Sequence, residues 1–112
     1  MDAAQLYSST LELLNATLLR MLSPAWDAKV HSSPADVRHE ALVQLLNVQH
    51  ARLVLGNAIL QEIAAPLKEN EKELLNGQKA LRAALDKLTT MESALNTVKS
   101  LVDVVARIVP LL

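Results

Sequence analysis

Residues 66–109, PLKENEKELLNGQKALRAALDKLTTMESALNTVKSLVDVVARIV, carry an aliphatic side chain at every seventh position. The members of this register are Leu67, Leu74, Leu81, Leu88, Leu95, Val102 and Val109. A seven-residue repeat keeps such side chains along one face of an α-helix, as in a coiled coil. The register therefore predicts one long helix over residues 66–109 with a continuous apolar seam.

Two features of this segment compete as the place where the chain reverses. Pro66 suits the first turn of a helix, whereas Asn76-Gly77 resembles a helix C-cap with glycine in the left-handed conformation. We place the reversal near Pro66, because the register continues through Asn76-Gly77 and an unbroken helix explains it most simply. A reversal near Asn76-Gly77 stays open as the alternative.

The same register also runs backward across the proline, through Leu60, Leu53 and Leu46. Taken alone, it fits one very long, kinked helix in an extended coiled coil. The companion seam, however, is polar or lacks side chains where a dimeric coiled coil prefers leucine. Its residues are Gln49, Gly56, Asn70 and Gly77. We therefore predict a hairpin of two helices rather than a rod.

A second helix is predicted over residues 34–64. Ser33 can cap it, Pro34 suits the first helical position, and Asp36 favours the positive helix end. Its apolar side chains form two adjoining seams, one with Leu42, Leu46, Leu53, Leu60 and Ile63 and the other with Leu45, Val48, Leu55 and Ile59. One neighbour covers only one seam, so we expect this helix at the centre, between at least two others.

A first amphipathic helix is predicted over residues 3–22. Its apolar side chains recur at three- and four-residue spacings, as Tyr7, Leu11, Leu14, Leu18 and Met21. Ser23-Pro24 ends this helix, because a residue before proline is pushed out of the helical region. Residues 23–33 are expected to form a connecting loop, with Trp26 folded back to cover the core.

Composition predicts the same fold class. The 112 residues are 51% hydrophobic and 2% aromatic, with two glycines, a mixture that favours helices over strands. This length allows one hydrophobic core. We therefore predict a single all-α domain over residues 1–112. It is an up-down bundle of three main helices, of which the second and third are long, amphipathic and partly coiled-coil-like.

Charge and motifs exclude several functional classes. The 11 basic and 12 acidic residues are interspersed, which gives no footprint for nucleic acid. The absence of cysteine excludes thiolate catalysis and thiolate zinc sites. The sequence has no glycine-rich phosphate loop and no HExxH or GxSxG motif. We therefore expect a protein without enzymatic activity or cofactor. The lack of a signal-like N-terminus or an uninterrupted apolar span predicts a cytoplasmic location.

One polar cluster is a weak candidate for metal binding. Asp36, His39 and Glu40 lie within two turns of the second predicted helix, but no second cluster completes a ligand set. His39 and His50 are eleven residues apart, roughly 16 Å at ~1.5 Å per residue, too far to share one ion. We predict no metal site.

The last helical segment suggests association with another protein. Between Val98 and Val109 the only charged residues are Lys99, Asp103 and Arg107. Such a broad apolar arc exceeds what one helix of a small bundle normally turns inward, so we expect a second subunit or a partner helix to cover it. We predict a non-catalytic interaction or scaffold module that forms a homo-oligomer, with a dimer favoured, or binds a helical partner.

The interface candidates lie in the apolar seams of the second and third predicted helices: Leu45, Val48, Leu55, Gly56, Ile59, Leu101, Val104, Val105 and Ile108. The alternative function is a membrane-associated helical protein that uses its apolar C-terminal segment. A helix that binds anionic lipid generally has a basic polar face, which this segment lacks. We therefore expect protein rather than membrane to cover it, and we expect Pro110 to end the helix.

Overall fold

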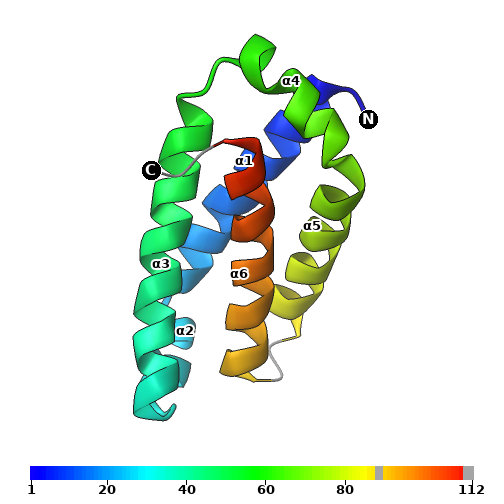
Figure 1. Ribbon diagram of the computed structural model, residues 1–112. Helices are drawn as coiled ribbons and strands as arrows, with labels where there is room; N and C mark the ends of the chain where they lie inside the picture. The colour runs from blue at the N-terminus through cyan, green and yellow to red at the C-terminus, as the bar shows by residue number, and fades with distance from the viewer. Residues whose placement is uncertain (88–89, 110–112) are drawn as a thin grey trace.

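The computed structural model describes residues 1–87 and 90–109, and its regular structure is entirely helical. In those residues the helices are α1 (Ala3–Met21), α2 (Pro24–His31), α3 (Ala35–Gly56), α4 (Leu60–Glu69), α5 (Glu71–Asp86) and α6 (Met91–Ile108). The predicted all-α class is confirmed. Figure 1 shows that the longer helices α1, α3, α5 and α6 run alternately down and up the molecule, with the short α2 and α4 between them.

Helix α6 lies at the centre of the packing. It contacts α3, α4 and α5, while α1 packs across α3, α4 and α5 from behind. The most deeply buried side chains of α6 are Val98, Leu101 and Val105, each 1% exposed or less. They belong to one hydrophobic core cluster to which all of the helices contribute. As expected, the helix that begins in residues 34–64, α3, packs between at least two others, but the central place expected for it belongs to α6.

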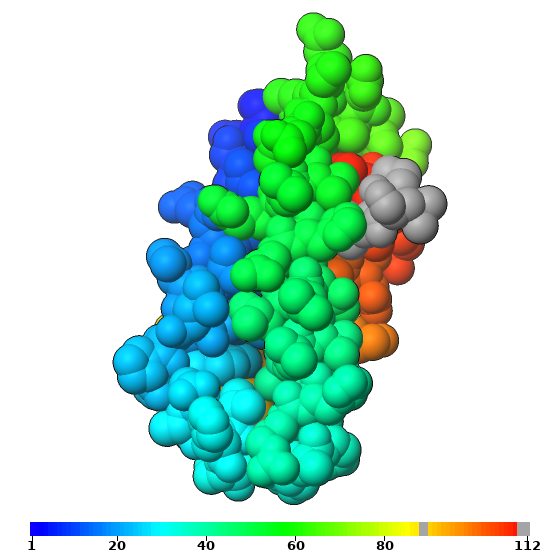
Figure 2. Space-filling model, turned by 90° about the vertical axis from the view of Figure 1, so that its left-hand side faces the viewer, coloured from blue at the N-terminus to red at the C-terminus, as the bar shows by residue number. Residues whose placement is uncertain are grey.

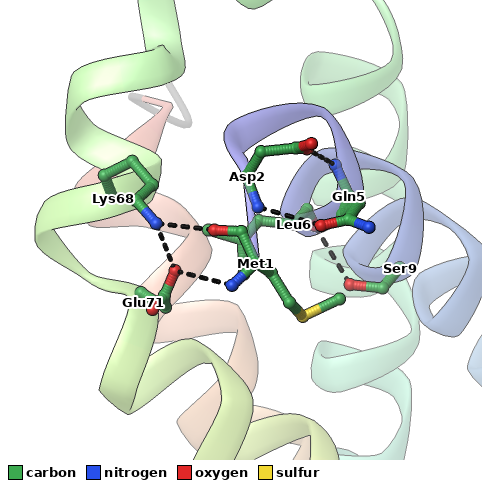
Figure 3. Close-up of polar contacts among 7 residues, drawn as sticks. All are labelled: Met1, Asp2, Gln5, Leu6, Ser9, Lys68 and Glu71. Atoms are coloured by element: carbon green, nitrogen blue, oxygen red, sulfur yellow. Dashed lines mark hydrogen bonds and ion pairs between the residues drawn. The ribbon is translucent and has the colours of Figure 1, made fainter.

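The start of α1 is fixed to the junction of α4 and α5 (Figure 3). Asp2 and Gln5 form a capping box, in which each side chain accepts a hydrogen bond from the other's backbone N–H. Across the junction, Lys68 Nζ donates to the Met1 carbonyl at 2.6 Å and to the Glu71 carboxylate at 2.7 Å. The hydrogen bond from the Lys68 ammonium lowers the pKa of the partly buried Glu71 carboxyl. Helix α1, predicted over residues 3–22, has nearly the predicted ends.

Residues 23–33 are not the predicted loop, because most of them form α2. Ser23 caps this helix with its Oγ, which accepts from the Trp26 N–H at 3.3 Å, and Pro24 occupies the first turn. Trp26 is 2% exposed, so its predicted place against the core is correct. Ser33, by contrast, does not cap α3. Its hydroxyl donates to the Lys29 carbonyl at 2.7 Å, and α3 begins at Ala35.

The two helices predicted over residues 34–64 and 66–109 are each broken. The first ends at Gly56, and the next begins at Leu60 and continues through Pro66 to Glu69. Asn70 separates α4 from α5, and Asn76-Gly77 lies inside α5. The chain therefore reverses neither at Pro66 nor at Asn76-Gly77. It turns after Gly56 and again between α5 and α6, which run in opposite directions.

The seven-residue register nevertheless marks the core. Its described members after the proline are all 7% exposed or less: Leu67, Leu74, Leu81, Leu95, Val102 and Val109. They are distributed over α4, α5 and α6 and the residue after α6. Leu88 and the predicted helix end at Pro110 lie outside the described residues. The register thus identified buried positions correctly, although the single continuous helix drawn from it is wrong.

Helix α3 is rotated relative to the prediction. Leu42 and Leu46 are each 56% exposed and Leu53 is 61% exposed, although their seam was expected to be covered. The buried face contains Ala41, Gln44, Val48, Ala51 and Leu55. This face includes two small residues and packs against α1 and α6, and the leucine seam therefore faces outward.

This rotation predicts different costs for two neighbouring leucines. Leu55 is 1% exposed, so Leu55→Ala should lower the free energy of unfolding by about 2–5 kcal/mol. Leu53→Ala removes the same atoms from a side chain that is mostly in solvent and should cost less than about 1 kcal/mol. Urea denaturation followed by circular dichroism at low micromolar concentration measures both. Equal losses of stability at the two sites would mean that a different face of α3 is buried.

A glycine in the middle of α5 marks its crossing with α6. A Cβ added at Gly77 would lie 3.4 Å from Leu101 Cδ1 and 3.9 Å from Leu101 Cα. A methyl group at that position makes ordinary contact, whereas a longer side chain would push the two helices apart.

Gly77→Ala should therefore stabilise the fold by about 0.5–1 kcal/mol, because alanine loses less backbone entropy in a helix than glycine. Gly77→Leu should destabilise it by about 1–3 kcal/mol through overpacking. Thermal melts of the two variants and the parent chain test this pair. A destabilising alanine would show that the helices cross more closely than the structure has them.

Candidate protein-interaction surface

Most of the interface residues proposed from sequence lie in the core of this chain. The buried ones, each 7% exposed or less, are Val48, Leu55, Leu101, Val104, Val105 and Ile108. A second subunit can reach them only by displacing contacts that the chain already makes. Leu45 is half-buried, and Gly56 and Ile59 are exposed. The broad apolar arc of α6 is covered by α3, α4 and α5, so its breadth does not call for a second subunit.

Three of the exposed large apolar side chains of the described residues lie instead on the outer side of α3. Leu42, Leu46, Gln49 and Leu53 follow one another at spacings of four, three and four residues, which places them on one helix face. All four are exposed. We name this set the α3 leucine face. Figure 2 looks onto this side of the molecule, where α3 runs up the middle below α4, with α1 and α2 on one side and α6 on the other.

Two hollows open beside the α3 leucine face, both between α3 and the α1–α2 segment. The first, the Trp26 hollow, has a volume of about 170 Å³ and is lined mainly by Met21, Trp26, Val30, Leu42 and Leu45. The second, the Asn15 hollow, has a volume of about 220 Å³ and is lined by Leu11, Asn15, Arg52, Leu53, Gly56 and Asn57. Leu42 and Leu53, which rim them, are eleven residues apart, or roughly 16 Å at ~1.5 Å per residue.

The charges around this face are mainly basic. Arg38 lines the Trp26 hollow, and Arg52 lines the Asn15 hollow, where its Nε donates to Asn15 Oδ1. His39 and His50 are exposed on the opposite flank, by their helical register. The two acids of α3, Asp36 and Glu40, line a different cleft, next to α6. Asp27 of α2 is the acid that shares the Trp26 hollow with Arg38.

The acidic cleft is the second candidate site. Asp36 and Glu40 from α3 face Glu92 and Asn96 from α6 across a volume of about 270 Å³. His39, which the sequence grouped with the first two, does not line it. Within residues 1–87 and 90–109, no group of three or more His, Cys, Asp or Glu side chains is placed to hold a metal ion. The absence of a functional metal site stays a prediction.

Behind this cleft, Gln44 is buried with one polar atom unpaired. The side chain is 1% exposed, and its Nε2 donates to Glu40 Oε1 at 2.8 Å. Its Oε1 has no hydrogen-bond partner among the described residues. The other deeply buried glutamine, Gln78, donates from Nε2 to Thr10 Oγ1 at 2.9 Å and so links α5 to α1.

The two glutamines should therefore respond oppositely to the same substitution. Gln44→Met removes an unpaired buried oxygen at similar volume and should leave stability unchanged or raise it by up to about 1 kcal/mol. Gln78→Met removes a buried hydrogen bond between helices and should cost about 1 kcal/mol. Denaturant titration of both variants gives the comparison. A loss above about 1 kcal/mol for Gln44→Met would mean that its bond to Glu40 outweighs the unpaired oxygen.

The membrane alternative has less support on the described surface. The apolar side chains of α6 that would enter a lipid interface are packed inside the protein. Among the described residues, no helix combines the length and apolar character needed to cross a bilayer.

Comparison with known proteins gives no match. No protein-family model matches the sequence, and neither a curated protein nor a solved structure matches the chain.

Proposed function

We propose that the protein is a non-catalytic interaction module that binds another α-helix on the α3 leucine face. The observation that supports this is the exposure of Leu42, Leu46 and Leu53 by 56%, 56% and 61% along one side of a 22-residue helix. Burying a leucine side chain fully is worth roughly 1.5–3 kcal/mol, so covering these three half-exposed side chains offers roughly 3–5 kcal/mol before ordering costs.

The spacing of the face favours a helical partner. Intervals of four, three and four residues are those at which two helices interdigitate their side chains in a coiled-coil-like seam. The two hollows extend this seam on the α1–α2 side. Because they are about eleven residues of helix apart, they fit apolar side chains at positions i and i+11 of one docked helix.

Two further parts of this proposal come from the sequence. The chain has no cysteine and no recognised catalytic motif, which fits a binding role without chemistry. The same lack of cysteine fits action in the reducing cytoplasm.

Site-specific photo-crosslinking in living cells tests the proposed surface. A benzophenone amino acid is placed at Gln49, within the leucine face, and at Lys79, an exposed position on α5 away from α3. We expect a discrete protein adduct from position 49 and none from position 79. Leu46→Lys should abolish the adduct, because the charge lies in the middle of the apolar seam.

Leu46 is already exposed, so Leu46→Lys should change the melting temperature by no more than a few degrees, which separates loss of binding from loss of fold. Equal adducts from positions 49 and 79, or an adduct that survives Leu46→Lys, would contradict the proposed surface. Absence of any adduct from position 49 would contradict it as well.

A further inference from the structure

We infer that the occupant of the α3 leucine face is a second copy of this chain, whose α3 packs antiparallel to the first about a two-fold axis. This inference rests on the proposed function and names its partner. Three features of α3 support it: the symmetry of the leucine spacing, the position of the two hollows, and the distribution of charge along the helix.

The spacing of the leucine face is the same in both chain directions. A two-fold axis perpendicular to α3, midway between residues 47 and 48, maps each position onto one of the other three. It sets Leu42 of one copy against Leu53 of the other, and Leu46 against Gln49. Every leucine of the face is then covered by the equivalent surface of the second copy, as a closed two-fold dimer requires.

The hollows provide matching receptors for the end leucines. Leu42 rims the Trp26 hollow and Leu53 rims the Asn15 hollow, and the two leucines are themselves eleven residues apart. In the antiparallel pair, Leu53 of the second copy reaches the level of the Trp26 hollow, and Leu42 of the second copy reaches the Asn15 hollow. The distance along α3 between the two end leucines is thus the same as the distance between the two hollows beside them.

The charges of α3 favour the antiparallel direction over the parallel one. Arg38 and His39 are exposed near the start of α3, whereas its last turn holds no basic residue. Antiparallel packing brings these two side chains to Asn57 and Gly56 of the second copy, at the negative end of that helix. The other two basic residues of α3, His50 and Arg52, then lie level with Leu45 and Val43 of the second copy, whereas parallel packing would bring all four basic residues level with their own counterparts.

The size of the surface sets the expected affinity. Helix α3 has 22 residues, about 33 Å at ~1.5 Å per residue, and a helix is roughly 10–12 Å wide. That gives roughly 350 Å² per copy, below half of the ~800 Å² that each partner buries in a standard interface. Two other large apolar side chains, Ile59 and Leu22, are 58% and 59% exposed. We therefore expect a weak, readily dissociated dimer, with a Kd of roughly 100 μM.

Sedimentation velocity of the purified chain over low to high micromolar concentrations measures the association. The mass should shift from monomer to dimer, and Leu46→Lys should raise Kd by at least tenfold. The matched control is Leu19→Lys, which places the same charge on an equally apolar but outward position of α1, 72% exposed. It should leave Kd within about twofold. A chain that stays monomeric throughout, or an equal effect of both lysines, would overturn the inference.

Disulfide trapping tests the direction, since the chain has no cysteine of its own. Leu42→Cys and Leu53→Cys chains are prepared separately and oxidised alone and as an equimolar mixture. Antiparallel packing predicts the mixed 42–53 disulfide in the mixture at several times the yield of either chain alone. Preferential 42–42 and 53–53 disulfides would overturn the antiparallel arrangement.

The two proposals fail in different ways. If position 49 crosslinks in cells to a protein of another mass while the purified chain remains monomeric, the second copy is ruled out and the interaction surface stands. If position 49 crosslinks to nothing and no dimer forms, both are ruled out. An adduct of twice the chain mass together with the mixed disulfide supports both.

Discussion

The arrangement of the other helices follows from the need to cover α6. Nine of its 18 residues are buried, and they cover about half of its circumference. A helix of that kind is stable in water only when neighbours enclose it, because each large aliphatic side chain left exposed forfeits roughly 1.5–3 kcal/mol. The chain reverses between α5 and α6 and places Gly77 against Leu101, so that the two backbones approach closely. Helices α3 and α4 then cover most of the remaining apolar surface.

Between residues 66 and 109, burial was predicted better than the helix ends. The seven-residue register correctly marked Leu81 and Leu95 as core positions, yet they belong to antiparallel helices. Periodicity indicates which side chains share a helix face. If a turn leaves the seven-residue spacing unchanged, the spacing does not reveal the turn. Helix α2 was missed although Ser-Pro-Ala occurs at residues 23–25 as well as at 33–35. The first of these is the true serine cap, with Pro24 in the first turn.

The candidate surface could be predicted only in part, because both sides of α3 are apolar. Hydrophobicity favours the leucine seam as the buried one. Close packing favours the other, where Ala41 and Ala51 let the helix approach α1 and α6 around Val48. The sequence pattern does not show which of two apolar faces packs against the neighbouring helices. Val48 and Leu55 were therefore predicted at an interface, and Leu46 in the core. The two hollows are lined by residues of α1, α2 and α3, and the periodicity of one helix does not predict how several helices pack together.

The leucine face is also unnecessary for the fold of one chain. Leu42, Leu46 and Leu53 make few of the contacts that hold α3 in place, and polar residues at these positions would cost the single chain little stability while reducing its tendency to aggregate. The fold of the single chain does not require them, which agrees with the proposed contact. Gln49 between them limits how tightly the face can bind, since an amide covered by leucine loses hydrogen bonds to water. Three leucines interrupted by one glutamine suit a contact that forms at micromolar concentration and can separate again.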